Sequence, residues 1–207
     1  MKSVALFGGT FNPIHYGHLA IAEEVRTKHN LDKVIFVPAN LPPHKEPEDL
    51  VDAQRRSVMA YLATVSNPCF EVSTFEVDRG GKSYTVDTVR HFHHLFGGKV
   101  ELFFIIGADM LPEIFSWKNI GGILELCRFI AVSRPGYDVQ KILNQHFLSA
   151  QDHSTASKML ERILVEETAM LDISATAIRR RIKEWKSIKY LVPEPVEQFI
   201  HNQQLYL

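Results

Sequence analysis

The chain has 207 residues, of which 45% are hydrophobic and 23% charged, and its formal net charge is −1. This length suits a single domain, residues 1–207, that buries roughly 70% of its unfolded surface without disulfides or metals. A nearly neutral charge argues against a general nucleic-acid or membrane-binding surface, which would need an excess of basic residues.

The cysteines and the apolar runs indicate the compartment. Cys69 and Cys127 are far apart and flanked by apolar residues, which is typical of reduced, buried thiols. The apolar run after Lys2 has only four residues before Gly8, too few for a signal peptide, and no run is long enough to span a membrane. We therefore expect a cytoplasmic protein without nucleic-acid or membrane partners; the sequence is compatible with a homo-oligomer.

Strand and helix signals alternate through the first two thirds of the chain. Short apolar runs predict strands at residues 4–7, 34–37, 70–75, 100–106 and 129–132. Apolar residues at helical spacing predict helices at residues 18–29, 52–65, 85–96 and 120–126. Because most of the strands are contiguously apolar, helices should cover both faces of the sheet. The pattern predicts an α/β fold with a Rossmann-like, doubly wound parallel sheet.

The last third of the chain has a different pattern. Helices are predicted at residues 138–148, 154–160, 173–185 and 193–203, with a sixth short strand at residues 162–165. Ser174 is the expected N-cap of the third of these helices. Residues from about 170 to 207 should therefore form a small helical C-terminal part of the domain.

The run from Gly8 to His18 follows the first strand and leads into a helix. Gly8 and Gly9 allow a turn that exposes backbone amides to an anion. His15 and His18 lie three apart, on one face of the first helical turn, where imidazoles can donate to phosphate oxygens beside the helix N-terminus. The alternative is a glycine turn with two capping histidines, but one turn has little structural need for both.

A second group occupies the start of the helix that follows Ile173. Ser174 and Thr176 provide hydroxyls, and Arg179 and Arg180 follow one turn later. Hydroxyls, free amides and a guanidinium at a helix start suit a second phosphate site. The alternative is a plain serine cap with solvated arginines.

In a parallel sheet, ligands bind beyond the carboxyl ends of the strands. After the second strand, Pro42 and Pro43 stiffen a loop that carries the cations His44 and Lys45; an ordinary exposed loop is the alternative. After the strand at 100–106, a nucleotide could approach Gly107 closely, and Asp109 could accept from a ribose hydroxyl or cap a helix.

Four stretches carry a family resemblance. They are Gly8–His18, with its His-x-Gly-His signature, Ser83–Thr88, Ile173–Arg179 and Tyr190–Pro193. Together they resemble the nucleotidylyltransferase superfamily and, within it, the bacterial nicotinate-nucleotide adenylyltransferases. The likeness spans nearly the whole chain. It departs from the family at Asn12, where many members have aspartate, and at Ala175, where a second serine is common.

The resemblance implies transfer of the adenylyl group of ATP to nicotinate mononucleotide, which gives deamido-NAD and pyrophosphate. It implies Mg²⁺ held mainly by the ATP phosphates, so no protein ligand to the metal is assigned. Implied catalytic residues are His15, His18 and Arg179. Implied ATP-binding residues are Gly8, Gly9, Thr10, Phe11, Lys45, Gly107, Asp109, Arg134, Ile173, Ser174 and Thr176. Implied nicotinate mononucleotide-binding residues are Asn40, His44, Lys45, Tyr84, Thr85 and Trp117.

In this interpretation the Trp117 indole stacks on the pyridine ring, and backbone amides around Thr85 receive its carboxylate. Trp117 could instead anchor the core. Another adenylyltransferase, for nicotinamide mononucleotide or pantetheine phosphate, would share both phosphate motifs, although the pantetheine enzymes are generally shorter and lack the Ser83–Thr88 and Trp117 elements. An aminoacyl-tRNA synthetase fragment would need a Lys-Met-Ser-Lys-Ser loop and a basic surface, and the chain has neither. Both histidines and Arg179 argue against a non-catalytic regulator.

Overall fold

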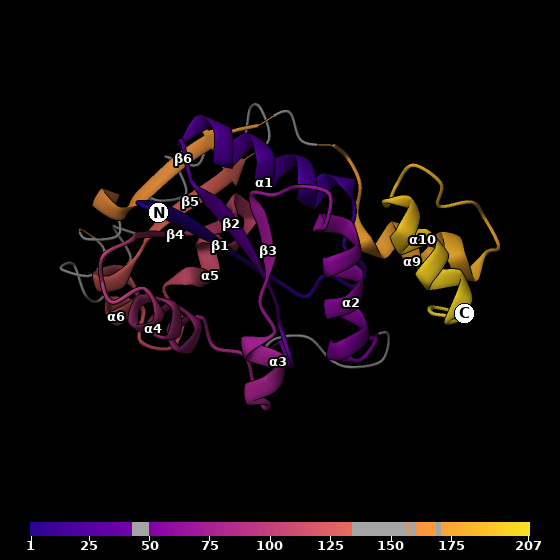
Figure 1. The fold of residues 1–207 in the computed structure, drawn as a ribbon, viewed down its shortest axis with the longest axis horizontal. Coiled ribbons are helices and arrows are strands. Elements are labelled where there is room, and N and C mark those ends of the chain that lie inside the picture. Colours follow the sequence, from indigo (N-terminus) through magenta and orange to yellow (C-terminus); the bar gives the residue numbers. More distant parts are fainter. Residues whose placement is uncertain (43–49, 134–156, 158–159, 169–170) are drawn as a thin grey trace.

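The computed structural model describes residues 1–42, 50–133, 157, 160–168 and 171–207. A six-stranded, all-parallel sheet runs through the molecule in the order β3-β2-β1-β4-β5-β6 (Figure 1). Its strands are β1 (Ser3–Gly9), β2 (Lys33–Pro38), β3 (Phe70–Val72), β4 (Glu101–Gly107), β5 (Arg128–Ser133) and β6 (Ile163–Glu167). The strand order reverses between β1 and β4, and this is the point where parallel sheets of this kind bind their ligands.

The described helices connect these strands and continue after the last one. They are α1 (Tyr16–Lys28), α2 (Ala53–Thr64), α3 (Phe75–Arg79), α4 (Thr85–Leu95), the 3₁₀ turn η1 (Ala108–Met110), α5 (Leu111–Ile114), α6 (Ile120–Leu126), α9 (Ala175–Lys183) and α10 (Glu194–Asn202). In the part of the chain that the structure describes, no helix is long and apolar enough to cross a membrane.

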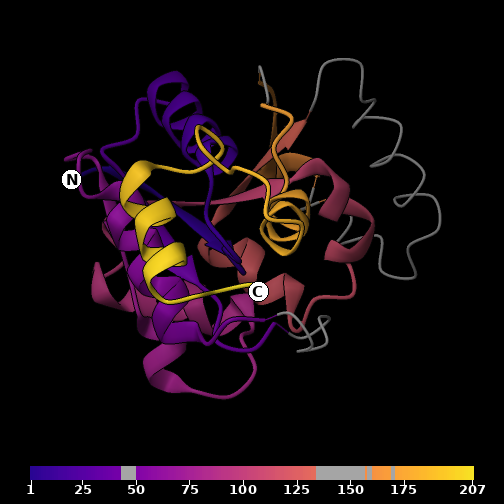
Figure 2. The same cartoon turned by 90° about the vertical axis from the view of Figure 1, so that its right-hand side faces the viewer.

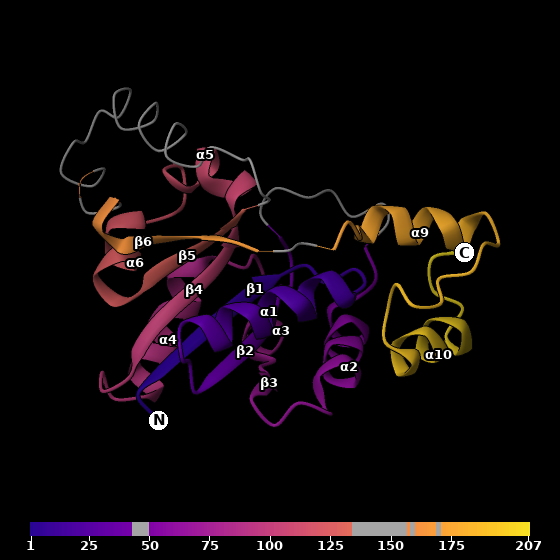
Figure 3. The same cartoon turned by 90° about the horizontal axis from the view of Figure 1, so that it is seen from above.

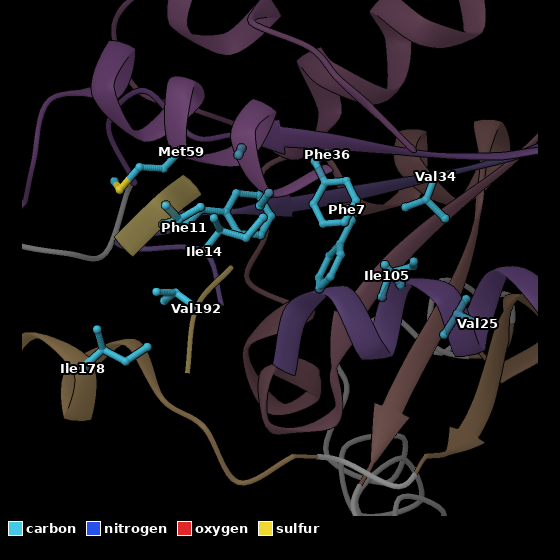
Figure 4. Packing of buried hydrophobic residues seen from close by; sticks show 14 of the residues in the cluster. Phe7, Phe11, Ile14, Val25, Val34, Phe36, Met59, Ile105, Ile178 and Val192 are labelled. Carbon is cyan, nitrogen blue, oxygen red and sulfur yellow. The ribbon is translucent and has the colours of Figure 1, made fainter. Parts of the chain in front are cut away.

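Alternating residues of the buried strands face two separate apolar layers. Phe7 and Phe36 pack with Met59 of α2 and Val25 of α1 on one face (Figure 4). Leu6 and the strand residues whose side chains point to the other face of the sheet pack against α4, α5 and α6. Figure 1 shows α1 on one side of the sheet and α4 and α6 on the opposite side. The predicted doubly wound α/β fold is confirmed.

The C-terminal helices share the first of these layers. Ile178 of α9 and Val192, just before α10, belong to the same apolar cluster as Phe11 and Ile14 (Figure 4). Figures 2 and 3 show α10 beside α2, and both C-terminal helices at one end of the molecule. The backbone N–H of Tyr16 donates to the carbonyl of Leu191 at 3.1 Å, which ties the start of α1 to this part of the chain.

Two predicted elements differ from the observed ones. The strand predicted at 70–75 ends at Val72, because the Ser73 hydroxyl accepts from the N–H of Phe75 at 3.2 Å and the chain turns into α3. The first helix begins at Tyr16 and not at His18, since His15 takes the N-cap position. The helix predicted at 138–148 lies outside the described residues, and most of the one at 154–160 does as well.

Candidate active site

The turn predicted at Gly8 and Gly9 is wrong, because both are the last residues of β1, paired with Val37 and Pro38, and their backbone lies in close contact with aromatic rings. A Cβ atom on Gly8 would lie 2.8 Å from the ring of Phe104, and one on Gly9 would lie 2.9 Å from the ring of Phe11. Phe11 packs edge-on against the imidazole of His18, with ring centroids 5.1 Å apart. Only glycine allows the backbone to approach these rings, so the pair fixes the end of β1 and one wall of the site that contains His18.

The two histidines form a stacked pair at the start of α1. Their ring centroids are 3.7 Å apart, and the backbone N–H of His15 donates to Nδ1 of His18 at 3.2 Å. While that bond is intact, Nδ1 of His18 carries no proton, so its Nε2–H is the donor that the ring offers to a ligand. Burial lowers the pKa of His15 to about 4, which keeps this ring neutral near pH 7.

The start of α9 lies beside the start of α1. Arg179 Nη1 donates to the backbone carbonyl of Asn12 at 2.9 Å, across 167 residues of chain. A Cβ on Gly17 would lie 3.6 Å from the carbonyl oxygen of Ile173. The structure thus brings the early histidines and the late arginine together, beyond the carboxyl end of β1.

Hydroxyl groups at the start of α9 already have intramolecular partners. Ser174 Oγ accepts from the N–H of Ala177 at 3.2 Å, as the N-cap of the helix. Thr176 is exposed, and its Oγ1 accepts from Arg179 Nη2 at 3.5 Å. Ser174 is therefore a helix cap, as its alternative interpretation expected, and it is also part of the candidate site.

Gly107 ends β4, which is paired with β1 at the reversal of strand order, and Asp109 follows it. Gly107 is the N-cap of η1, and Asp109 is exposed within that turn, so Asp109 is not the capping residue. Its carboxylate lies against the backbone of Gly107 at the carboxyl edge of the sheet. The predicted site residues His44, Lys45 and Arg134 lie outside the described residues.

On the other side of the sheet edge, Tyr84 is the N-cap of α4 and no side chain caps that helix. Thr85 is its first residue, so the amides at the helix start could bind an anion without a competing side-chain cap. Lys118 Nζ lies 4.3 Å from the centroid of the Tyr84 ring, which brings the segment after β4 next to α4. Trp117, half-buried, packs its ring at steep angles against Phe104 and Phe129, with centroids 6.3 and 6.1 Å away.

Arg56 is a residue that the sequence analysis did not single out. It is fully buried on α2, and its guanidinium donates to the backbone carbonyls of Val51, Thr10 and Asn40 at 2.7, 2.7 and 2.8 Å. A signal for its burial was present, because Arg56 shares a helical face with the apolar residue Met59.

Glu76 on α3 was also missed. It is buried, and burial raises the pKa of its carboxyl group. The hydroxyls of Ser83 and Thr88 bond to this carboxylate.

Within the described ranges, no group of three or more histidine, cysteine, aspartate or glutamate side chains could hold a metal ion.

Comparison with known proteins identifies the family of the chain. The cytidylyltransferase-like family model matches residues 6–181. The "Probable nicotinate-nucleotide adenylyltransferase" of Moorella thermoacetica is 47% identical over 206 residues, covering 98% of this chain and 91% of that protein. A protein of the same name from a Thermoanaerobacter species is 44% identical over 204 residues, with 98% and 93% covered. The chain belongs to the nicotinate-nucleotide adenylyltransferase family.

Solved structures show that this adenylyltransferase has the same fold as distant relatives. Plasmodium falciparum nicotinic acid mononucleotide adenylyltransferase complexed with NaAD matches with a TM-score of 0.75 at 18% identity, over 100% of this chain and 98% of the other. The same parasite protein complexed with APC matches with a TM-score of 0.72 at 17% identity, with equal coverage. At these identities the likeness concerns the fold alone.

Proposed function

We propose that this adenylyltransferase transfers the adenylyl group of ATP to nicotinate mononucleotide, with release of pyrophosphate. The observation that carries the proposal is the convergence of His15, His18 and Arg179 where the strand order reverses. Family membership supports the choice of ATP and nicotinate mononucleotide. The Plasmodium relative's complexes with NaAD and APC also support it.

The chemistry is an in-line displacement at the α-phosphorus of ATP. An oxygen of the acceptor's phosphate forms the new bond to phosphorus, and the bond to the bridging oxygen breaks, so the electron pair leaves with pyrophosphate. The two histidines and Arg179 donate hydrogen bonds to the triphosphate as negative charge grows on the leaving oxygens. No covalent enzyme intermediate is needed, because positioning and charge stabilisation supply the rate enhancement.

ATP would lie along the carboxyl edge of β1 and β4. In this proposal the backbone of Gly8, Gly9, Thr10 and Phe11 lies against the nucleotide, Asp109 accepts from a ribose hydroxyl, and Ile173, Ser174 and Thr176 flank the phosphates. Lys45 and Arg134 are proposed to complete the site from residues outside the described ranges.

Nicotinate mononucleotide would lie against Asn40, Tyr84, Thr85 and Trp117, with His44 and Lys45 completing its site. The steep packing of Trp117 against Phe104 and Phe129 fixes the plane of the indole, which suits stacking on a pyridine ring. The uncapped start of α4 favours a carboxylate over a neutral carboxamide.

Mg²⁺ would be held by the ATP phosphates and water, since this cation keeps several waters and rarely occupies an all-protein cage. The donor-rich site fits that arrangement: its described groups bind phosphate oxygens and leave the metal to the nucleotide. When bound, the ion neutralises charge on the leaving pyrophosphate. We propose that the reaction takes place in the cytoplasm.

The test is pyrophosphate release from Mg-ATP with nicotinate mononucleotide or its amide as the acceptor. We expect a clearly higher kcat/KM for the acid, and a His18→Ala variant that melts like the parent but turns over orders of magnitude more slowly. Equal use of both acceptors would refute the specificity argument. Full activity in His18→Ala would refute the assignment of the site.

A further inference from the structure

A chain of partly buried hydrogen bonds joins the turn after β1 to the loop after β2 and to the start of α4. Arg56 donates to the carbonyls of Thr10 and Asn40, one on each loop. The backbone N–H of Asn40 donates to Ser83 Oγ at 2.9 Å. Both backbone polar groups of Asn40 are therefore fixed, and its side-chain Nδ2 donates to the carbonyl of Gly81 at 2.9 Å as well.

Glu76 sets the direction of this chain of hydrogen bonds. Ser83 has one hydroxyl hydrogen, and when it is donated to the Glu76 carboxylate, an oxygen lone pair faces the N–H of Asn40. The Thr88 hydroxyl bonds to the same carboxylate from the next turn of α4. Ser83, Glu76 and Thr88 are all buried, so water cannot replace a lost partner without rearrangement.

Arg56 satisfies three backbone carbonyls from a buried position. Burying a guanidinium is costly, and in the described residues its hydrogen bonds go to backbone carbonyls and not to a carboxylate. An apolar side chain of the same size would leave those carbonyls without their donors. What the arginine adds is a rigid fork with two ends on two different loops, and rigidity of that kind preserves the distance between two bound molecules.

We propose that Arg56, Ser83 and Glu76 are positioning residues that hold the acceptor edge, defined as Asn40, Tyr84 and Thr85, at a fixed distance from the ATP-binding turn. The proposal rests on the proposed function, because that function assigns the acceptor to this edge. Each of the three residues acts through the backbone that it holds. Weakening these hydrogen bonds should therefore impair acceptor binding more than ATP binding.

The experiment compares Ser83→Ala with a matched control, Ser57→Ala. Ser57 is a buried serine next to Arg56 in the sequence, but its hydroxyl donates to the carbonyl of Ala53 within its own helix at 2.9 Å. Loss of one buried hydrogen bond should raise the KM for nicotinate mononucleotide about tenfold in Ser83→Ala, with less than about a twofold change in the KM for ATP. Ser57→Ala should leave both KM values unchanged.

Glu76→Gln provides a second variant of nearly identical shape. Its amide replaces one acceptor oxygen with an NH₂ donor, so a single oxygen is left to accept from both Ser83 and Thr88, and the KM for the acceptor should rise again. If both variants only melt at lower temperature and keep the parental KM for the acceptor, the positioning role is refuted. If the parent protein releases no pyrophosphate from Mg-ATP and nicotinate mononucleotide, the proposed function falls and the positioning role falls with it.

Discussion

Replacing Gly17 with alanine should separate activity from stability. Gly17 is buried in the first turn of α1, where an added Cβ would lie 3.0 Å from Nδ1 and 3.1 Å from Cε1 of the His15 ring. These contacts are tighter than ordinary van der Waals packing, so the ring must shift by a few tenths of an ångström. Its face is already stacked on His18, so the shift disturbs the pair that we propose donates to the triphosphate. Since a misplacement of about 1 Å can cost a hundredfold in rate, we expect kcat to fall roughly threefold to tenfold.

Stability should change little or rise in the same variant, because alanine favours a helix over glycine by up to about 1 kcal/mol. Gly121→Ala is the matched control: it occupies the same position in the first turn of α6, and an added Cβ there has no neighbour within 4 Å. That variant should gain a similar stability and keep the parental kcat. Pyrophosphate release and thermal denaturation measure the two quantities. Parental kcat in Gly17→Ala would refute the claim that the His15 ring position limits turnover.

Three further outcomes follow from the same site. In His18→Ala we expect kcat to fall about 10²–10³-fold. His18→Gln keeps a donor near the position of Nε2, so its kcat should exceed that of His18→Ala. Equal kcat values in the two variants would show that the donor is not used. Arg179→Lys keeps the charge but cannot span both the Asn12 carbonyl and the Thr176 hydroxyl, so kcat/KM for ATP should fall about tenfold or more, and an unchanged value would contradict this. The pKa of His15 is lowered to about 4 in the folded chain, so between pH 6.5 and 4 the unfolded chain binds a proton at this residue and the folded chain does not. The free energy of unfolding should therefore fall by up to about 3 kcal/mol as the pH drops from about 6.5 to 4. Urea titrations should show a smaller fall in His15→Gln, and the same pH dependence in both proteins would contradict the buried neutral ring.

The sequence predicted the parallel sheet and a helix cap well. Contiguous apolar runs such as Val34–Val37 identify strands covered on both faces, because both faces of each strand must then be apolar. Ser174 was expected as a helix cap, and its hydroxyl accepts a backbone N–H in the structure. Local chemistry decides features of this kind, and it can be read from neighbouring residues.

Long-range polar contacts were harder to predict. Arg56 follows Arg55 in the sequence, and adjacent arginines on a helix ordinarily suggest a solvated face, yet one is buried and the other is exposed. The position of each arginine around the helix axis decides which of the two is buried. The loop carbonyls that accept from Arg56 belong to Asn40 and Thr10, which are 16 and 46 residues away in the sequence. Glu76 was missed because the sequence predicted a strand through residue 75, whereas the strand ends at Val72 and the chain turns into α3 at Phe75.

The hydrogen bond between Tyr206 and Asn12 has a consequence for how activity arises during folding. The phenol donates to Asn12 Oδ1 at 2.9 Å across 194 residues, and burial raises the pKa of that phenol, which keeps its proton in place. Contacts of such large sequence separation form late, after the loop between them has been ordered. A refolding chain should therefore recover its far-ultraviolet circular dichroism before its catalytic activity. Folding intermediates that contain the complete sheet should have no activity in an enzyme assay.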